Sequence, residues 1–464
     1  MTFALSLFFV AVALLVVSGV GLATSGAFLP LDHAFFLERL GWSDAIGCAV
    51  VMAFVPAALG LGVRPGLIAF VMVVAPLIVV ARRLAPLAPP SPRGGRGMRR
   101  DGVGEGRLPR TLKLLIGLGV AVYALRALTE PMWSNDFIAI WGLKGKTIWG
   151  SGGYPESFYR STPFEFAHPE YPLGLPLLYA GLAFLTGRWD DHAMALLFPF
   201  LQAATLLVLF GWLRRRGVAP VAAGLATAIL AWFEPLYSAF LTGMAEVPLA
   251  FGMLLFGTAL ADTLDETDAG AARRLALASA LIAATKNEGL FLAAVGFLVA
   301  LAFGRAAARW KGAAAALLPA LAVRALHLPW RSRLPLADLE AGLFSRDRVW
   351  DALTAAGGLL GPAAWIGLAL VVVLIAAGDR VAAGDRLLLL VAASLAAYLV
   401  IPAFAVRGPA WLVETTLRRT AAGLAPLAAA AIAARFSGAS SGSGRDPRAS
   451  AGSPEPPPPS TPES

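Results

Sequence analysis

The chain has 464 residues, of which 58% are hydrophobic and only 14% are charged, and its mean hydropathy is +0.71. Soluble domains carry about 25% charged residues, so this composition argues against a soluble enzyme. Apolar runs recur from end to end, and they are continuous rather than alternating. We therefore predict an all-α polytopic membrane protein and not a β-barrel. The single cysteine, Cys48, allows no intramolecular disulfide.

The N-terminal part, residues 1–81, is expected to form a three-helix membrane segment. Its apolar runs lie at about 5–29, 45–62 and 66–81. The first run is too long for a signal-peptide core and has no clear cleavage site, so we expect it to be retained. The Pro- and Gly-rich linker 82–110 that follows is strongly basic and is expected to be disordered and cytoplasmic. It lacks the interleaved aromatic residues of a nucleic-acid patch, so no nucleic-acid partner is expected.

A membrane core is expected over 111–436. Its predicted spans are 111–129, 192–213, 218–237, 247–262, 275–304, 312–327, 355–377, 386–405 and 415–436. Basic residues flank 275–304 on both sides, so we expect two short crossings there, joined at an outer turn. The total is about 13 transmembrane helices, with the N-terminus outside. The Ser-, Gly- and Pro-rich tail 437–464 is expected to be disordered.

The first large external loop is expected over 130–191. Within it, the apolar run 173–186 has only 14 residues and contains Pro176. A run this short does not span a bilayer, so we expect an interfacial helix. This placement also leaves the basic triplet at 214–216 in the cytoplasm, as the positive-inside rule requires.

Under this topology, the unusual polar and aromatic residues of the core gather at the outer side of the membrane. They are Asp136, Lys144, Lys146, His168, Glu170, Tyr171, Asp190, Asp191, Glu246, Lys286, Glu288, Arg331, Arg333, Arg418 and Arg419. A charge at membrane depth costs about 2.5–3.5 kcal/mol on insertion scales, so such groups tend to face a cavity or a partner. We take this set as the candidate site.

The acids and the lysine of this set each allow two interpretations. Asp136 lies between two tryptophans, where a carboxylate can act as a general base toward a hydroxyl acceptor. It could equally be a solvated charge or a helix cap. Glu246 could be a second acid or a cap for the helix that follows. Lys286 and Glu288 could form an internal ion pair or line a substrate cavity.

The arginines suggest an anionic ligand. Arg418 and Arg419 begin the last predicted span from its outer end, and arginine at a helix N-terminus favours phosphate. Arg331 and Arg333 could likewise bind an anionic ligand. The alternative for both arginine pairs is ordinary snorkelling, in which the charged ends of the side chains extend to the membrane interface. No Walker loop, HExxH motif, serine-hydrolase elbow or paired-cysteine metal site is present. His192 follows two aspartates, a combination that could bind a divalent cation, and no other cofactor is predicted.

Four short motifs, in order, resemble one enzyme superfamily. Asp136 with Ile140–Lys144, and then His168–Pro176, resembles the first external loop of polyprenyl-phosphate-dependent glycosyltransferases of the C-type membrane fold. This superfamily includes protein O-mannosyltransferases and the lipid A aminoarabinose transferase. Residues 242–248 resemble its second external loop, 284–289 a helix turn of bacterial members, and 414–419 its arginine-bearing late segment. Many members carry an Asp-Glu pair in the first loop, whereas here Phe137 follows the aspartate.

The resemblance implies a transferase that takes a sugar from a polyprenyl-phosphate donor at the outer face of a bacterial plasma (inner) membrane. Asp136 would deprotonate the acceptor hydroxyl, with inversion at the sugar carbon. Arg418 or Arg419, together with Lys286, would hold the donor phosphate. The acceptor would be a lipid, glycan or protein, and membrane lipids would surround the chain. The alternatives are a transporter or flippase for a lipid-linked or anionic substrate, and a membrane scaffold without activity.

Overall fold

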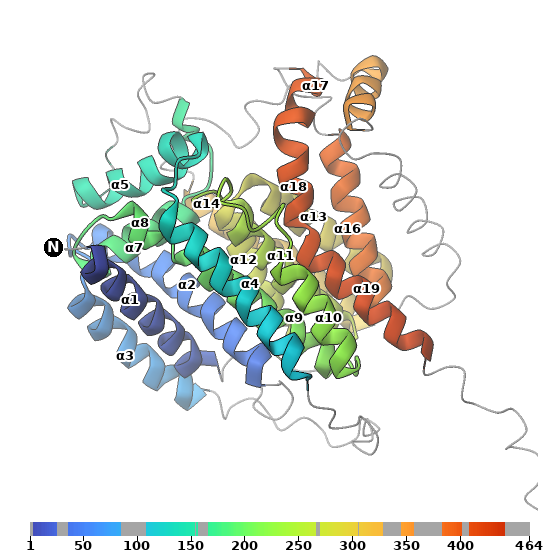
Figure 1. Cartoon of the computed structure of the whole chain (residues 1–464), viewed down its shortest axis with the longest axis horizontal. Helices are drawn as coiled ribbons and strands as arrows, with labels where there is room; N and C mark the ends of the chain where they lie inside the picture. Colours follow the sequence, from blue (N-terminus) through green and yellow to red (C-terminus); the bar gives the residue numbers. More distant parts are fainter. Residues whose placement is uncertain are drawn as a thin grey trace, which may run out of the picture.

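The computed structural model describes residues 3–25, 36–84, 108–153, 155, 166–265, 270–304, 306–327, 345–356, 383–400 and 408–440. Over these ranges the chain is helical and contains no β-strand. Figure 1 shows many of the long helices packed side by side with their axes roughly aligned. The predicted segment 355–377 lies almost entirely outside the described residues, as do Arg331 and Arg333.

Within the described ranges, five helices are long and apolar enough to cross a membrane. They are α1 (Phe3–Thr24), α2 (Phe36–Gly60), α4 (Arg110–Thr129), the continuous pair α8 and α9 (Asp191–Arg215), and α11 (Glu246–Leu264). Shorter apolar helices lie at Leu67–Pro76, Gly174–Thr186, Pro220–Ala231, Asn287–Phe303 and Ala425–Arg435. The prediction of an all-α membrane protein is confirmed at this level.

Several helices differ in length from the predicted spans. The helix α10 (Pro220–Ala231) ends well before residue 237, and irregular turns follow it up to α11. Segment 275–304 is divided, as expected, into α12 (Ala271–Thr285) and α13 (Asn287–Phe303), and α14 (Ala306–His327) packs against both. Lys286 sits at the first break with an extended backbone, φ −152° and ψ 160°.

The N-terminal helices pack as part of the core. A Cβ atom on Gly21 of α1 would lie only 1.7 Å from the Ser43 carbonyl oxygen of α2, so the two helices cross in close contact. The other face of α2 packs on α9, where Gly211 lies against the backbone of Glu38. The helices α1 and α2 therefore pack on the part of the chain that carries the candidate motifs.

The helix α11 is the centre of the bundle, and every one of its residues is buried. It packs against α12, α9, α13, α14 and α19 (Ala425–Ser440), which ends four residues past the predicted last span at 436. Glu246 begins α11 and Asp262 lies near its end, about 24 Å away at 1.5 Å per residue. The only charged residues of this helix thus lie toward its two ends, each within a cluster of charges.

The helix α7 (Gly174–Thr186) has 13 residues, so it is too short to cross a bilayer, as expected. Its residues from 174 to 184 are all buried, and it packs against α2 and α5 (Gly142–Ser151). Protein rather than a lipid interface therefore covers this helix. Gly174 lies so close to α12 that a Cβ atom would be 2.5 Å from the Ala284 carbonyl oxygen. This contact brings the external loop to the break at Lys286.

Candidate active site

Five charged side chains from four distant parts of the chain form a connected cluster, here called the outer cluster: Asp136, Glu246, Lys286, Glu288 and Arg419. Arg419 Nη1 lies 2.8 Å from Asp136 Oδ2, and Arg419 Nε lies 3.6 Å from Glu246 Oε1. Lys286 Nζ lies 3.2 Å from the same Glu246 oxygen and 2.7 Å from Glu288 Oε1. Three carboxylates and two cations therefore share one network.

Two irregular helical turns lie next to Asp136 and Arg419, which form an ion pair in this network. A π-helical turn, Phe137–Trp141, begins directly after Asp136, and a second, Val413–Leu417, ends directly before Arg418. Such turns insert an extra residue into a helix and occur frequently at functional sites. The second turn lies between α17 (Pro409–Leu412) and α18 (Arg418–Gly423).

Glu246 is the buried anchor of the outer cluster, with only 2% of its surface exposed. Its Oε2 atom accepts no hydrogen bond from the described residues. Lys286 is also buried, whereas Asp136 and Glu288 keep about a quarter of their side-chain surface exposed, 29% and 22%. Glu246 and Lys286 are therefore structural members of the outer cluster, whereas the carboxylates of Asp136 and Glu288 are accessible to a ligand.

Two tyrosines lie beside the outer cluster. Burial, together with the negative charge of Glu288, raises the pKa of the Tyr171 phenol well above its ordinary value. Tyr398 of α16 (Ala383–Val400) interacts electrostatically with Glu288 and Lys286. Tyr398 was missed from the sequence, because a tyrosine in an apolar segment gives no signal of its own.

The predicted residues of the external loop form a second cluster that supports Tyr171. Its ring stacks on Trp141 and His168, with centroids 5.5 and 4.6 Å apart. Lys144 is fully buried and donates a hydrogen bond to the His168 carbonyl oxygen at 2.5 Å. His168 has a positive φ of 51°, an uncommon conformation for a residue other than glycine. These contacts fix the loop rather than bind a ligand directly.

Glu170 closes this second cluster through a hydrogen bond with His168, Nδ1 to Oε1, at 2.8 Å. Burial alone would raise the pKa of the Glu170 carboxyl. The bond with His168 and the charges of His168 and Lys144 outweigh burial and hold that pKa below its ordinary value. The carboxylate is thus stabilised by folding.

Replacing Glu170 by glutamine should therefore lower the free energy of unfolding at neutral pH by about 1.5–3 kcal/mol, the usual contribution of a hydrogen bond to a charged group. The pKa of the Glu170 carboxyl is lower in the folded chain than in the unfolded chain. Its contribution to stability is therefore fully present above the unfolded pKa, near 4, and is lost as the pH falls through the folded pKa. Thermal unfolding of purified wild type and E170Q across pH measures this. The exposed Glu130→Gln is the matched control, and a pH-independent difference for E170Q would contradict the assignment.

The remaining predicted residues are not in the outer cluster. Asp190 caps α8 (Asp191–Met194) by accepting a hydrogen bond from Ala193 N, and it pairs with Arg188. Asp191 accepts a hydrogen bond from the Trp189 indole. Lys146 is exposed and makes no ion pair within the described ranges. These three side chains have structural or solvated roles.

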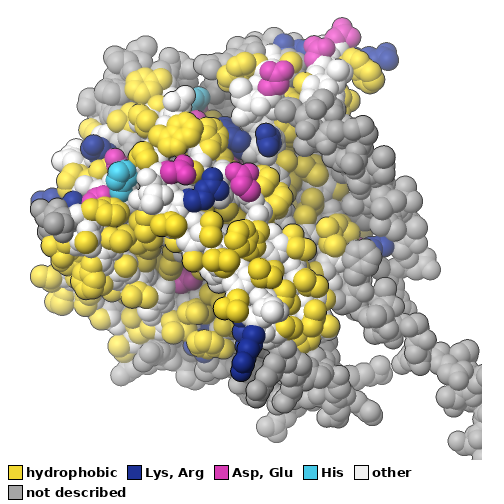
Figure 2. Space-filling view, in the orientation of Figure 1, with side chains coloured by type: hydrophobic (Ala, Val, Ile, Leu, Met, Phe, Trp, Pro, Cys, Tyr) yellow, Lys and Arg dark blue, Asp and Glu magenta, His cyan; other side chains and the backbone are white. Residues whose placement is uncertain are grey.

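A cavity of about 260 Å³ adjoins the outer cluster. Its lining includes Glu234, Ser238, Phe240, Arg418 and Arg419. Arg418 is exposed and, among the described residues, makes no ion pair. Figure 2 shows charged side chains gathered in a band across one face, with a mostly hydrophobic area below it. Glu234 was not predicted, because it lies inside the segment expected to span to residue 237.

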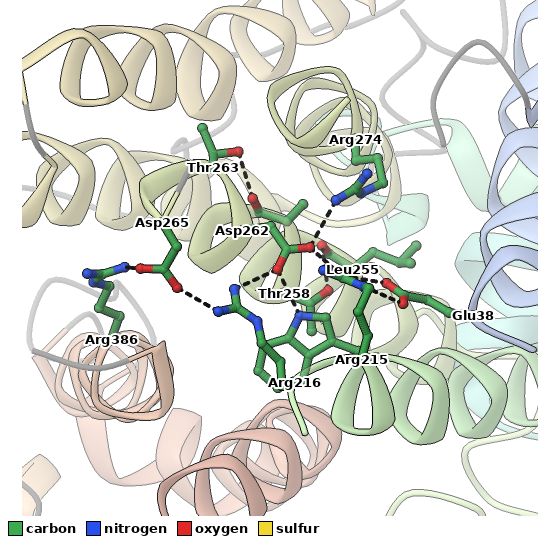
Figure 3. Close-up of polar contacts among 12 residues, drawn as sticks. Glu38, Arg215, Arg216, Leu255, Thr258, Asp262, Thr263, Asp265, Arg274 and Arg386 are labelled. Atoms are coloured by element: carbon green, nitrogen blue, oxygen red, sulfur yellow. Dashed lines mark hydrogen bonds and ion pairs between the residues drawn. The ribbon is translucent and has the colours of Figure 1, made fainter. Parts of the chain in front are cut away.

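A second charged cluster, the inner cluster, lies at the other end of α11 (Figure 3). Asp262 accepts hydrogen bonds from Arg215, Arg216 and Arg274 at 2.5, 2.6 and 2.9 Å. Arg215 also binds both carboxylate oxygens of Glu38. These residues come from α2, α9, α11 and α12, so the cluster ties four helices together at the side opposite to the outer cluster.

No family model, curated protein sequence or solved structure matches this chain. Within the described ranges, no group of three or more His, Cys, Asp or Glu side chains is arranged to hold a metal ion.

Proposed function

We propose that this chain is a membrane glycosyltransferase of the C-type fold, which moves a sugar from a polyprenyl-phosphate donor to an acceptor hydroxyl. The ion pair between Asp136 and Arg419 carries the proposal. Each of the four motifs that resemble this superfamily contributes to the outer cluster: Asp136 from the first, Glu246 from the second, Lys286 and Glu288 from the third, and Arg419 from the fourth.

The arrangement suits a single displacement. Asp136 accepts the proton of the acceptor hydroxyl, and the acceptor oxygen forms a bond to the anomeric carbon. The bond from that carbon to the phosphate oxygen breaks, and its electron pair leaves with the polyprenyl phosphate. Arg419 touches the base at 2.8 Å and lines the cavity, so it can stabilise both the carboxylate and the departing phosphate. Attack opposite the leaving group inverts the sugar carbon.

The other residues of the outer cluster have supporting roles in this proposal. Arg418 lines the same cavity and supplies a second guanidinium for the phosphate. Glu246, proposed from the sequence as a second acid, instead positions Arg419 and Lys286, because it is buried and contacts both. Lys286 pairs with Glu246 and orients Glu288.

We also propose that the chain crosses a bacterial plasma membrane about 13 times, with the outer cluster facing the periplasm or exterior. Arg215 and Arg216 lie at the end of α11 opposite to Asp136. The basic linker 82–110 precedes α4, whose far end leads to Asp136. Both features agree with the positive-inside rule.

The test is to incubate membranes containing the chain with a panel of radiolabelled polyprenyl-phosphate sugars and to follow the label. We expect one donor to lose its sugar to a non-prenyl acceptor, and membranes without the chain to show no transfer. Movement of an intact donor across the membrane without transfer would favour the flippase alternative and would overturn this proposal.

A further inference from the structure

A second hollow lies along α4, next to the cavity beside the outer cluster. The second hollow has a volume of about 130 Å³, and its lining includes Gly119, Val122, Arg126, Ala231 and Trp232. Glu234 lines both hollows, so they adjoin at this residue, and the two together are here called the α4–α10 groove. This groove starts at Arg418 and Arg419 and ends against the middle of α4.

Close packing of small residues forms the floor of the groove. A Cβ atom on Gly119 would lie 3.0 Å from the Ala231 side chain, so α4 and α10 meet with almost no side chain between them. Trp232 closes the edge by donating an indole hydrogen bond to the Leu115 carbonyl oxygen at 3.0 Å. The hollow follows α4 from Arg126 to Gly119, about 10 Å of helix at 1.5 Å per residue.

Charge and polarity change along the groove. At its outer end lie three cations, Arg126, Arg418 and Arg419, with one acid, Glu234. At its inner end the lining is Gly119, Val122 and Ala231, without charge. Since α4 is one of the helices able to cross the membrane, the groove descends from the charged end of α4 toward the apolar middle of the bilayer.

A ligand that matches this gradient has an anionic head and a narrow apolar chain. We propose that the α4–α10 groove binds the prenyl chain of the lipid donor, with the chain along Val122 and Ala231 and the phosphate at Arg418 and Arg419. The inference rests on the proposed function and adds the position of the lipid, together with a role for Arg126 and Glu234 at the mouth. A narrow groove favours one prenyl chain over the two acyl chains of a phospholipid.

The test compares tryptophan substitutions on α4. Val122→Trp fills the groove, whereas Leu118→Trp places the same side chain at a residue that is 53% exposed and does not line it. Binding of undecaprenyl phosphate, farnesyl phosphate and inorganic phosphate to purified full-length protein is followed by native mass spectrometry. We expect Val122→Trp to weaken undecaprenyl phosphate binding by about tenfold or more, the loss of two buried methylene groups, without changing inorganic phosphate. Leu118→Trp should change neither.

The remaining outcomes distinguish failure of the proposed groove from failure of the proposed function. If Val122→Trp binds undecaprenyl phosphate as well as the wild type does, while Arg419→Ala loses binding, the groove does not hold the prenyl chain. The proposed phosphate site at Arg419 would then still stand. Equal binding of phosphatidic acid and undecaprenyl phosphate would overturn the prenyl assignment, because the groove would then accept any anionic lipid. Absence of undecaprenyl phosphate binding by the wild type would contradict the groove and the proposed function together.

Discussion

Replacing Asp136 by asparagine is expected to lower sugar transfer by about 10²- to 10⁴-fold, the usual contribution of a general base. Asparagine keeps the shape of the side chain, and its amide oxygen can still accept the hydrogen bond from Arg419. The substitution therefore removes the base with little change to the fold. Transfer from the donor identified in the panel is measured in membranes with matched amounts of protein.

Asp190→Asn is the control for this substitution. Asp190 lies in the same external loop, but it caps α8, and asparagine is an equally good cap. We expect transfer within about twofold of wild type for this control, since nearly neutral substitutions change free energies by less than about 0.5 kcal/mol. Full activity of Asp136→Asn, or equal losses in both variants, would show that Asp136 is not the base.

Replacing Asp262 by alanine is expected to destabilise the fold by about 3–5 kcal/mol, because removal of one partner leaves buried charges uncompensated. Asp262 is 1% exposed and receives hydrogen bonds from three arginines and from the Trp212 indole. Of these arginines, Arg274 is also almost completely buried. The free energy of unfolding in mixed detergent micelles measures the change.

Asp265→Ala serves as the comparison at the same end of α11. Asp265 is 24% exposed and pairs with Arg216 and with Arg386 of α16. Pairs near the surface contribute about 0–1 kcal/mol, so the loss should be several times smaller than for Asp262→Ala. Equal small losses for both variants would mean that the inner cluster is hydrated and does not hold the helices together.

The division of segment 275–304 could be predicted from the sequence, because basic residues at both ends must lie on the same side of the membrane. The chain breaks at Lys286, and the side chain pairs with Glu246 and Glu288. The sequence already allowed an ion pair between Lys286 and Glu288, and the structure contains it. The pairing with Glu246 could not be predicted, because Glu246 lies 40 residues away and the contact depends on how the helices pack.

The ion pair between Asp136 and Arg419 could not be derived from sequence spacing, because the two residues are 283 positions apart. The π-helical turns beside them also leave no pattern in the sequence, since they depend on tertiary packing. The resemblance to a transferase superfamily placed both residues in the candidate site, but it did not predict a direct contact between them.

Hydropathy alone placed the start of the second predicted span and the end of the span predicted over 218–237 at the wrong residues. It set the start of the second span at 45, whereas α2 begins at Phe36 and includes Glu38. A charged residue inside a membrane protein is compatible with a span when its partner is also buried, as Arg215 is for Glu38. Apolar residues after Ala231 likewise extended the predicted span to 237, although they form turns around Glu234.

The anomeric configuration of the product tests the central claim that Asp136 and Arg419 carry out a single displacement at the outer cluster. Purified chain is supplied with the active polyprenyl-phosphate sugar and its acceptor, and the product is examined by NMR. We predict a sugar linkage of configuration opposite to that of the donor, formed by the wild type and lost in Asp136→Asn. A product of retained configuration would contradict the account, because a single attack opposite the leaving group inverts the anomeric carbon.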